Sequence, residues 1–114
     1  MKKLHLIVIL CIALCAACSK TETDPECVAM RALVDRVVPE YSKNIVLERL
    51  KADSVDRFEI ESKGKKLVIR GNNANSMAVG LNHYLKYYCH AQYSWFKEEP
   101  LELSATMPQV PEKV

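Results

Sequence analysis

Two carboxylates at alternate positions of one predicted strand, Glu59 and Glu61, are the first candidates for chemistry in this sequence. In the run Arg57-Phe-Glu-Ile-Glu61 apolar and acidic residues alternate, so both acids point to one face of a strand, about 7 Å apart. Two carboxyl groups about 5–5.5 Å apart can cleave a glycosidic bond, one as acid/base and one as nucleophile. A solvated hairpin face explains the same residues without catalysis, and we favour that interpretation.

Thiols and imidazoles are the next candidates. Cys27, Cys89, His83 and His90 could supply metal ligands, but none stands in a CxxC or HxxxH spacing. We therefore expect structural roles for them, with no bound metal and no cofactor. Cys27 and Cys89 could instead form one disulfide in an exported protein. Each lies at the end of a predicted helix, and we favour two separate, partly buried thiols.

Aromatic side chains cluster within thirteen residues of the chain. The cluster consists of Tyr84, Tyr87, Tyr88, Tyr93, Trp95 and Phe96. Rings of this kind could stack on sugars, or they could pack in the core or against another domain. We take Tyr93 and Trp95 as candidate contacts to a glycan or to a neighbouring domain.

The first 17 residues have the pattern of a secretory signal, with a basic start and an apolar run too short for a bilayer span of about 20 residues. Ala16-Ala17-Cys18-Ser19 resembles a bacterial lipobox, in which Cys18 is acylated and becomes the mature N-terminus. This pattern predicts an exported lipoprotein, anchored to the membrane in the periplasm or at the cell surface. Residues 18–26 would be its flexible tether. Ordinary signal cleavage and retention of the segment are the alternatives.

Charge and length exclude a nucleic-acid-binding protein and a complete (β/α)8-barrel enzyme. Removal of residues 1–17 takes away two lysines and leaves 14 basic and 14 acidic side chains. Because no basic excess remains, nucleic acid is excluded as a partner. The remaining 97 residues suffice for one domain with a modest core, whereas a (β/α)8 barrel needs about 250 residues.

The spacing of apolar residues predicts two helices. The first begins at Asp24-Pro25-Glu26, which offers a capping acid, a proline for the first turn and an acid for the positive end of the helix dipole. Apolar residues then recur every three or four positions until Pro39 stops the helix. The second helix is capped by Asn73 or Asn75 and runs to about Tyr88.

Two glycines mark special positions around the second helix. Gly71-Asn72-Asn73 precedes it, as a phosphate-binding loop would, but neither GxxxxGK[ST] nor GxGxxG occurs. A permissive turn is a sufficient explanation. Gly80 lies inside the helix, where glycine costs about 1 kcal/mol against alanine. We expect Gly80 to allow a close approach to the sheet or to the other helix.

Alternation and turn residues predict the strands. These are Ile45–Leu50, a hairpin of Arg57–Glu61 with Lys66–Arg70 that turns at Gly64, Gln92–Phe96 and a last short strand Leu101–Ser104. The order predicts an α+β domain over residues 27–106, with a small mixed or mostly antiparallel sheet and two helices packed on one face. Residues 107–114 carry two prolines and no period, which indicates a linker or a frayed tail.

Several motifs, in this order and spacing, resemble the N-terminal domain of alpha-N-acetylglucosaminidases, the glycoside hydrolase family 89. They are Arg36-Val-Val-Pro-Glu40, Phe58-Glu-Ile-Glu-Ser62, Lys66-Leu-Val-Ile-Arg-Gly-Asn-Asn73, Ala78-Val-Gly-Leu-Asn-His-Tyr-Leu-Lys-Tyr-Tyr-Cys89 and Ser94-Trp95. The resemblance implies a family that removes terminal alpha-linked N-acetylglucosamine with retention, using two carboxylates of a barrel domain. That barrel is not in this sequence, so no catalytic residue transfers to any position here.

Three hypotheses of function follow. The first is a truncated or split glycosidase, in which this domain is a non-catalytic scaffold for a missing barrel or a partner protein and carries an exposed apolar patch where the barrel docks. The second is a stand-alone surface lipoprotein that binds glycans or a partner protein. The third is an enzyme in its own right, for which we expect no turnover.

Overall fold

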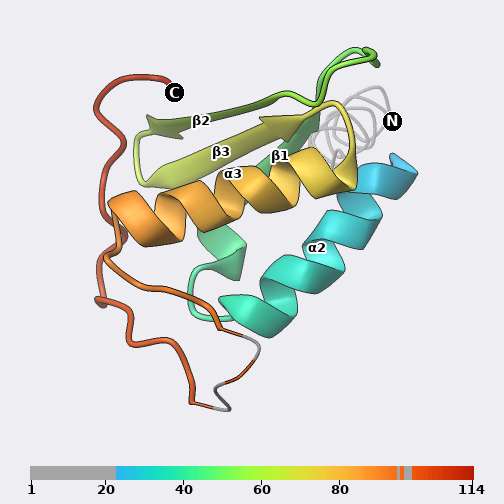
Figure 1. The fold of residues 1–114 in the computed structure, drawn as a ribbon. Coiled ribbons are helices and arrows are strands. Elements are labelled where there is room, and N and C mark those ends of the chain that lie inside the picture. Colours follow the sequence, from blue (N-terminus) through green and yellow to red (C-terminus); the bar gives the residue numbers. More distant parts are fainter. Residues whose placement is uncertain (1–22, 95, 97–98) are drawn as a thin grey trace, which may run out of the picture.

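The computed structural model describes residues 23–94, 96 and 99–114. The predicted signal segment, Cys18 and Trp95 lie outside the described residues, so the lipid anchor stays a prediction. Figure 1 shows two helices in front of a small sheet, followed by a long irregular C-terminal segment. Among the described residues, no helix has both the length and the apolar character to cross a bilayer.

The first helix, α2 (Pro25–Val37), begins as its sequence predicts. The Asp24 side chain accepts hydrogen bonds from the backbone amides of Glu26 and Cys27, at 2.9 and 3.4 Å. This cap satisfies amides that a helix start leaves unpaired. Pro25 and Glu26, the last residues of the predicted tether, therefore belong to the helix. The helix ends just before Pro39 and buries Cys27, Met30 and Val34.

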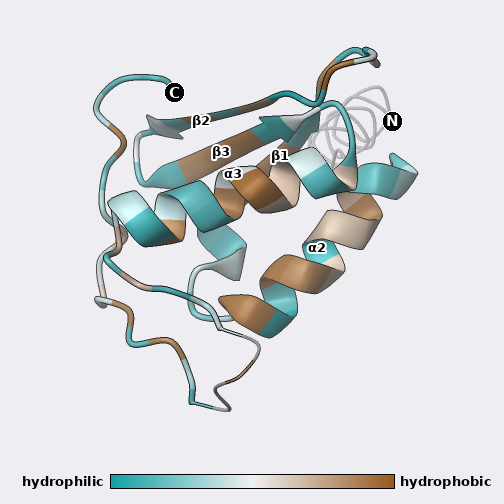
Figure 2. Ribbon diagram, viewed as in Figure 1, coloured by the Kyte–Doolittle hydropathy of each residue, from teal (hydrophilic) through white to brown (hydrophobic). Residues whose placement is uncertain are grey.

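The sheet is mixed and has the strand order β1-β3-β2. After the short 3-10 helix η1 (Ser42–Asn44), β1 (Ile45–Arg49) pairs in parallel with β3 (Lys66–Gly71), and β2 (Phe58–Lys63) pairs antiparallel with β3. The predicted hairpin is confirmed, with Gly64 at φ 59° in its turn. Central β3 is hydrophobic through its middle, whereas β2 is mostly hydrophilic (Figure 2).

The second helix, α3 (Ala74–Tyr87), lies across β3 and β2, while α2 lies against β1 and α3. Both helices cover the same face of the sheet (Figure 1), which confirms the predicted α+β arrangement. A Cβ added at Gly80 would lie 3.1 Å from Phe58 Cδ2 and 3.3 Å from Ile69 Cγ2. The helix therefore approaches the sheet closely at Gly80, as predicted. The core between the layers includes Ile45, Leu47, Ile60, Leu67 and Ile69 from the sheet.

The C-terminal segment differs most from prediction. No strand forms in residues 92–94 or 101–104, so the two last predicted strands are wrong where the structure describes them. Residues 104–114, which we call the strap, instead pack on the domain. Met107 and Val110 are buried, and Val114 exchanges two backbone hydrogen bonds with Ile60 of β2, at 2.9 and 3.0 Å. The expectation of a frayed tail over residues 107–114 is therefore corrected.

The strap is held by side chains far away in sequence. The Tyr41 hydroxyl donates to Ser104 O at 2.6 Å, and the Tyr84 hydroxyl donates to Pro108 O at 2.7 Å. Ser62 Oγ accepts from the Val110 amide at 2.8 Å. Burial raises the pKa of the Tyr84 phenol, which stays a hydrogen-bond donor. These contacts satisfy several of the strap's backbone groups without strand or helix periodicity, so the sequence pattern gives no sign of them.

Candidate functional site

Arg70 is the centre of an ion-pair network on the outer face of the sheet, which is turned away from both helices. In the strand register it lies directly opposite Glu48 of β1 and Glu59 of β2. Its guanidinium lies 2.6 Å from Glu48 Oε2, 2.7 Å from Glu61 Oε1 and 3.5 Å from Glu59 Oε2. Since the Arg70 side chain is only 13% exposed, these carboxylates enclose it. The two candidate acids thus share one cation.

This network lowers the pKa of one candidate acid, Glu61. The hydrogen bond from Arg70 holds the pKa of Glu61 below its usual range, and Lys63, 3.3 Å away, acts in the same direction. Burial of Arg70 opposes its charge, but hydrogen bonds to Glu61 and Glu48 leave the pKa of Arg70 raised. A general acid of a glycosidase needs a raised pKa. The geometry therefore makes Glu59 and Glu61 ion-pair partners of Arg70 rather than a catalytic acid–base pair.

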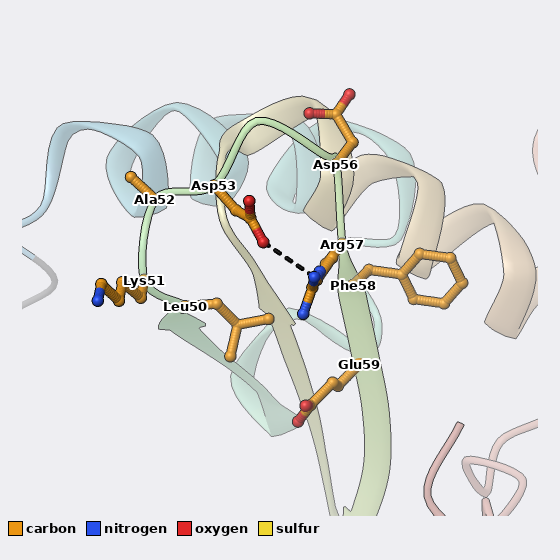
Figure 3. Close-up of a pocket in the computed structure, with 8 residues that line it drawn as sticks. All are labelled: Leu50, Lys51, Ala52, Asp53, Asp56, Arg57, Phe58 and Glu59. Carbon is orange, nitrogen blue, oxygen red and sulfur yellow. Dashed lines mark ion pairs between the residues drawn. The ribbon is translucent and has the colours of Figure 1, made fainter.

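An open groove of about 730 Å³ lies between the loop of residues 50–57 and the start of β2. In Figure 3, Leu50, Arg57 and Glu59 point toward the same side of the sheet, and Arg57 pairs with Asp53 at 3.0 Å. Phe58 points the opposite way, toward α3 (Figure 3). Throughout the part of the chain that the structure describes, every buried side-chain nitrogen or oxygen has a hydrogen-bond partner. No buried, unpaired side-chain polar atom therefore lines the groove among the described residues.

Asn72 holds this loop against the rest of the fold. Its side-chain amide donates to Val55 O at 2.7 Å, and its oxygen accepts from the Arg57 amide at 3.0 Å and from Ser76 Oγ at 2.9 Å. Asn72 itself is 4% exposed. One buried side chain therefore joins the loop, the start of β2 and the first turn of α3. The sequence indicates the turn but not this role of Asn72, because the partner amide and carbonyl lie more than a dozen residues away.

The N-terminus of α3 is already occupied by the protein's own side chains. Asn73 caps the helix by accepting from the Ser76 amide at 2.7 Å, and Glu26 of α2 accepts from the Ala74 amide at 2.6 Å. A carboxylate thus lies where an external anion would bind. A Cβ at Gly71 would lie 2.8 Å from the Met77 backbone nitrogen, so glycine is needed for the tight turn. The interpretation of this unit as a turn is confirmed.

A second surface of interest runs along the outer side of α3. The rings of Phe58 and His83 have centroids 5.6 Å apart, and those of His83 and Tyr87 are 4.6 Å apart. Val79 lies one helical turn before His83 and is 48% exposed, and Tyr87 is 56% exposed. We call these four residues the α3 ridge. Tyr87 belongs to the aromatic cluster that is apparent in the sequence, whereas Phe58 lies far from it in the chain and is brought to α3 by the hairpin.

The other predicted aromatic contacts are divided by the fold. Tyr84 is completely buried, whereas Tyr93 and Phe96 are 56% and 75% exposed. Tyr93 lines hollows beside Pro100 and Leu101. Trp95 lies outside the described residues, so the proposed Tyr93–Trp95 pair stays a prediction. The exposure of Tyr93 is compatible with contact to a glycan or a neighbouring domain.

Cys27 and Cys89 are not joined by a disulfide, as favoured from the sequence. Cys27 follows Glu26, which contacts the start of α3, while Cys89 follows its C-terminal end. A helix of this length spans about 20 Å, and a disulfide requires Cα atoms within about 7 Å. Burial raises the pKa of the Cys89 thiol, which also makes it a poor nucleophile. No group of His, Cys, Asp and Glu among the described residues could hold a metal ion.

Comparisons with known proteins point to one group of enzymes. Residues 28–109 match the family model described as the alpha-N-acetylglucosaminidase N-terminal domain. The family 89 glycoside hydrolase from Clostridium perfringens, solved in complex with 2-acetamido-1,2-dideoxynojirmycin, is similar with a TM-score of 0.69 and 36% identity. Its complex with PUGNAc gives the same values. A doubly substituted form in complex with its substrate GlcNAc-alpha-1,4-galactose gives 0.68 and 34%.

These matches cover 75% of this chain and 10% of the Clostridium chain. No curated protein matches the chain. This chain therefore spans about a tenth of the length of the solved enzymes that it resembles.

Proposed function

The chain belongs to the family of alpha-N-acetylglucosaminidase N-terminal domains, and from this premise we propose that it is the non-catalytic N-terminal scaffold of an exported glycoside hydrolase of that kind. The reaction would be the release of terminal alpha-linked N-acetylglucosamine by a catalytic module outside residues 23–114. That module would belong to the remainder of the protein or to a second chain.

The observation that carries this proposal is the extent of the match. It includes almost the whole folded part of this chain, yet only a tenth of the Clostridium chain. About 250 residues are needed for a (β/α)8 barrel. We therefore assign the catalytic role to the part of such an enzyme that corresponds to the uncovered nine tenths of the Clostridium chain.

The chemistry of the described residues supports the same assignment. The most suggestive carboxylate pair, Glu59 and Glu61, is engaged by Arg70, and the pKa of Glu61 is lowered rather than raised. A retaining glycosidase needs one carboxylic acid that stays protonated near neutral pH. The lowered pKa of Glu61 is the opposite of what such an acid requires.

Export and anchoring form a separate part of the proposal. The basic start, the apolar run and Ala16-Ala17-Cys18-Ser19 support acylation of Cys18 and attachment of the domain to a membrane. Expression of the full chain in a bacterial host that acylates lipoproteins should give a product whose mass includes lipid and whose N-terminus is blocked. The Cys18→Ala variant should lack the lipid and leave the membrane fraction. A wild-type product that keeps residues 1–17 contradicts this part.

An activity assay tests the non-catalytic role. Residues 18–114 are incubated with GlcNAc-alpha-1,4-galactose, and release of N-acetylglucosamine is measured. We expect no release above the buffer control, while the complete Clostridium enzyme serves as the positive control. Hydrolysis by the chain alone, retained through repeated purification, would contradict the proposal.

A second candidate function is glycan binding by a stand-alone lipoprotein. The exposure of Tyr93 favours it, because an accessible ring can stack on a sugar. Titration with GlcNAc-alpha-1,4-galactose, followed through the NMR signals of Tyr93, tests this function. Saturable shifts that Tyr93→Ser abolishes would support it, and unchanged signals at millimolar sugar would remove its basis.

A further inference from the structure

The outer face of α3 lacks the charges that normally cover a solvent-exposed helix. In its 14 residues Lys86 is the one charged side chain, and its ammonium lies 5.2 Å from the centre of the Tyr87 ring. In contrast, the 13 residues of α2 include Glu26, Arg31, Asp35 and Arg36. Both helices bury one face against the same core, so burial of the inner face does not explain the difference. Uncharged and aromatic surface is typical of the centre of a protein interface.

The exposed apolar groups on this face form one continuous strip. Val79, His83 and Tyr87 follow each other at helical intervals of four residues, and Phe58 of β2 packs against the ring of His83. Val79 and Tyr87 are each about half exposed. The strip is rigid because α3 is fixed at both ends, by Asn73 and Glu26 at its start and by Tyr84 and the strap near its end.

Two other surfaces of the domain, the outer face of the sheet and the edge of β2, are already engaged. On the outer face of the sheet, Arg70 is enclosed by Glu48, Glu59 and Glu61, so docking there would strip water from a charged network. The edge of β2 pairs with Val114 at Ile60. Of these three surfaces, the α3 ridge is the one that a partner could cover without stripping water from a charged network or displacing the strap.

We propose that the α3 ridge is the docking surface for the catalytic module of a family 89 glycoside hydrolase. This inference rests on the function proposed above and adds the face, the anchoring side chains and the chemistry of the partner. Domains within one chain typically share an interface of about 600–1,500 Å², and aromatic anchors dominate such contacts. The module would present an apolar surface with a hollow for the Tyr87 ring and a hydrogen-bonding group for His83.

The occupant follows from the relatives. Domains of this family are described as N-terminal, and the Clostridium enzyme is about ten times as long as the matched region. A domain of this size at the start of such an enzyme lies next to a much larger folded body. A glycan alone would need polar partners around the ring, whereas the ridge combines valine, phenylalanine and tyrosine.

A binding experiment can separate the face from the function. The probe is the Clostridium enzyme without its own equivalent N-terminal domain, titrated with the full chain lacking only residues 1–17. Variants Val79→Glu and Tyr87→Lys, alone and together, are compared with Val28→Glu. Val28 is a matched control, since it is a valine of α2 that is 51% exposed. Circular dichroism and thermal unfolding establish that every variant is folded.

We expect the wild-type chain and Val28→Glu to bind alike, and the double variant to bind about thirtyfold more weakly or not at all. Equal binding by all variants would overturn the assignment of the face and leave the proposed function intact. No binding by the wild-type chain up to millimolar concentration would overturn the proposed function together with the inference.

Two other occupants are outcomes of the same experiment. Concentration-dependent self-association that the double variant abolishes would make the ridge an interface between copies of this chain. Shifts of the His83 and Tyr87 signals with GlcNAc-alpha-1,4-galactose alone would make it a glycan surface. Either result would overturn docking of a catalytic module on this face.

Discussion

The outer face of the sheet and the outer face of α3 lie on opposite sides of one core and differ in how their side chains are satisfied. On the sheet, charged residues are abundant, and Arg70 of β3 pairs with three carboxylates from the two neighbouring strands, Glu48 of β1 and Glu59 and Glu61 of β2. On α3, charged residues are scarce, and the side chains of Val79 and Tyr87 are about half exposed to water. The sheet face is thus complete within the chain, whereas the α3 face is complete only in the complex that we propose.

This difference teaches how to separate stability from function in a small domain. A network whose partners all belong to the same chain contributes to folding, so its loss should appear in the unfolding of the isolated protein. A face without internal partners contributes little to folding, so its loss should appear only when the partner is present. The following predictions test that distinction, from the largest expected effect on unfolding to the smallest.

Replacement of Arg70 should give the largest loss of stability. Arg70→Met keeps the length of the side chain but leaves Glu48, Glu59 and Glu61 close together without their shared cation. Breaking a largely buried ion pair costs about 3 kcal/mol, and we expect a loss of that order in the free energy of unfolding, measured by urea denaturation at pH 7. Arg57→Ala, which breaks an exposed pair with Asp53, should cost under about 1 kcal/mol. Equal effects of both variants would contradict the central role of Arg70.

The sequence predicted one half of this network and missed the other. Alternation within β2 placed Glu59 and Glu61 on one face, because that pattern is local. Arg70 reaches the two acids because β3 pairs with β2, and it reaches Glu48, 22 residues earlier, because β3 pairs in parallel with β1. The alternation within one strand does not predict how strands pair with each other. The hairpin, the Asn73 cap and the close approach at Gly80 were predicted because local residue types specify them. The strap was missed because isolated contacts such as Tyr84–Pro108 hold it, rather than any periodic pattern.

Removal of the Tyr84 hydroxyl should give an intermediate loss in the free energy of unfolding. The strap pairs with β2 through Val114 and Ile60, and Tyr84 ties it to the inner side of α3. Tyr84→Phe leaves the Pro108 carbonyl without its donor, and an intramolecular hydrogen bond contributes about 1 kcal/mol. We expect a loss of about 1–2 kcal/mol in thermal or urea unfolding, together with faster amide exchange at Val110 and Val114.

The exposed tyrosine of the same region provides the control. Tyr93→Phe removes a hydroxyl from a side chain that is 56% exposed and whose hydroxyl has no hydrogen bond to another described residue. Its unfolding free energy should stay within about 0.5 kcal/mol of wild type. If exchange at Val110 were unchanged in Tyr84→Phe, the strap would be held mainly by its buried side chains Met107 and Val110 rather than by this hydrogen bond.

Acidification should weaken the sheet face selectively. The pKa of Glu61 in the folded chain lies below its usual value of 4.5, chiefly because Arg70 donates a hydrogen bond to it. Its contribution to stability is therefore complete above about pH 4.5 and disappears as the pH falls through the lowered value. Urea denaturation between pH 7 and pH 3 should show a smaller acid-induced loss for Glu61→Gln than for wild type.

Some acid sensitivity should remain in Glu61→Gln. Burial of Asp24 opposes ionisation, but hydrogen bonds from the Glu26 and Cys27 amides and from Arg49 lower the pKa of Asp24 overall. This second group titrates in the same direction at the start of α2. The Arg70→Met variant should lose the Glu61 component as well, so identical acid profiles for wild type and Arg70→Met would contradict the cause assigned to the shift.

Charges placed on the α3 ridge should have the smallest effect on unfolding. Val79→Glu and Tyr87→Lys put good helix formers at half-exposed positions, and the lysine suits the C-terminal end of the helix dipole. Each should leave the free energy of unfolding within about 0.5 kcal/mol of wild type. A loss comparable to that of Arg70→Met would mean that the ridge is part of the core, and the contrast between the two faces would disappear. The contrast requires a double variant that is as stable as wild type but no longer binds the catalytic module. Such a result would show that the apolar face of α3 contributes to binding of an external partner and not to the free energy of unfolding.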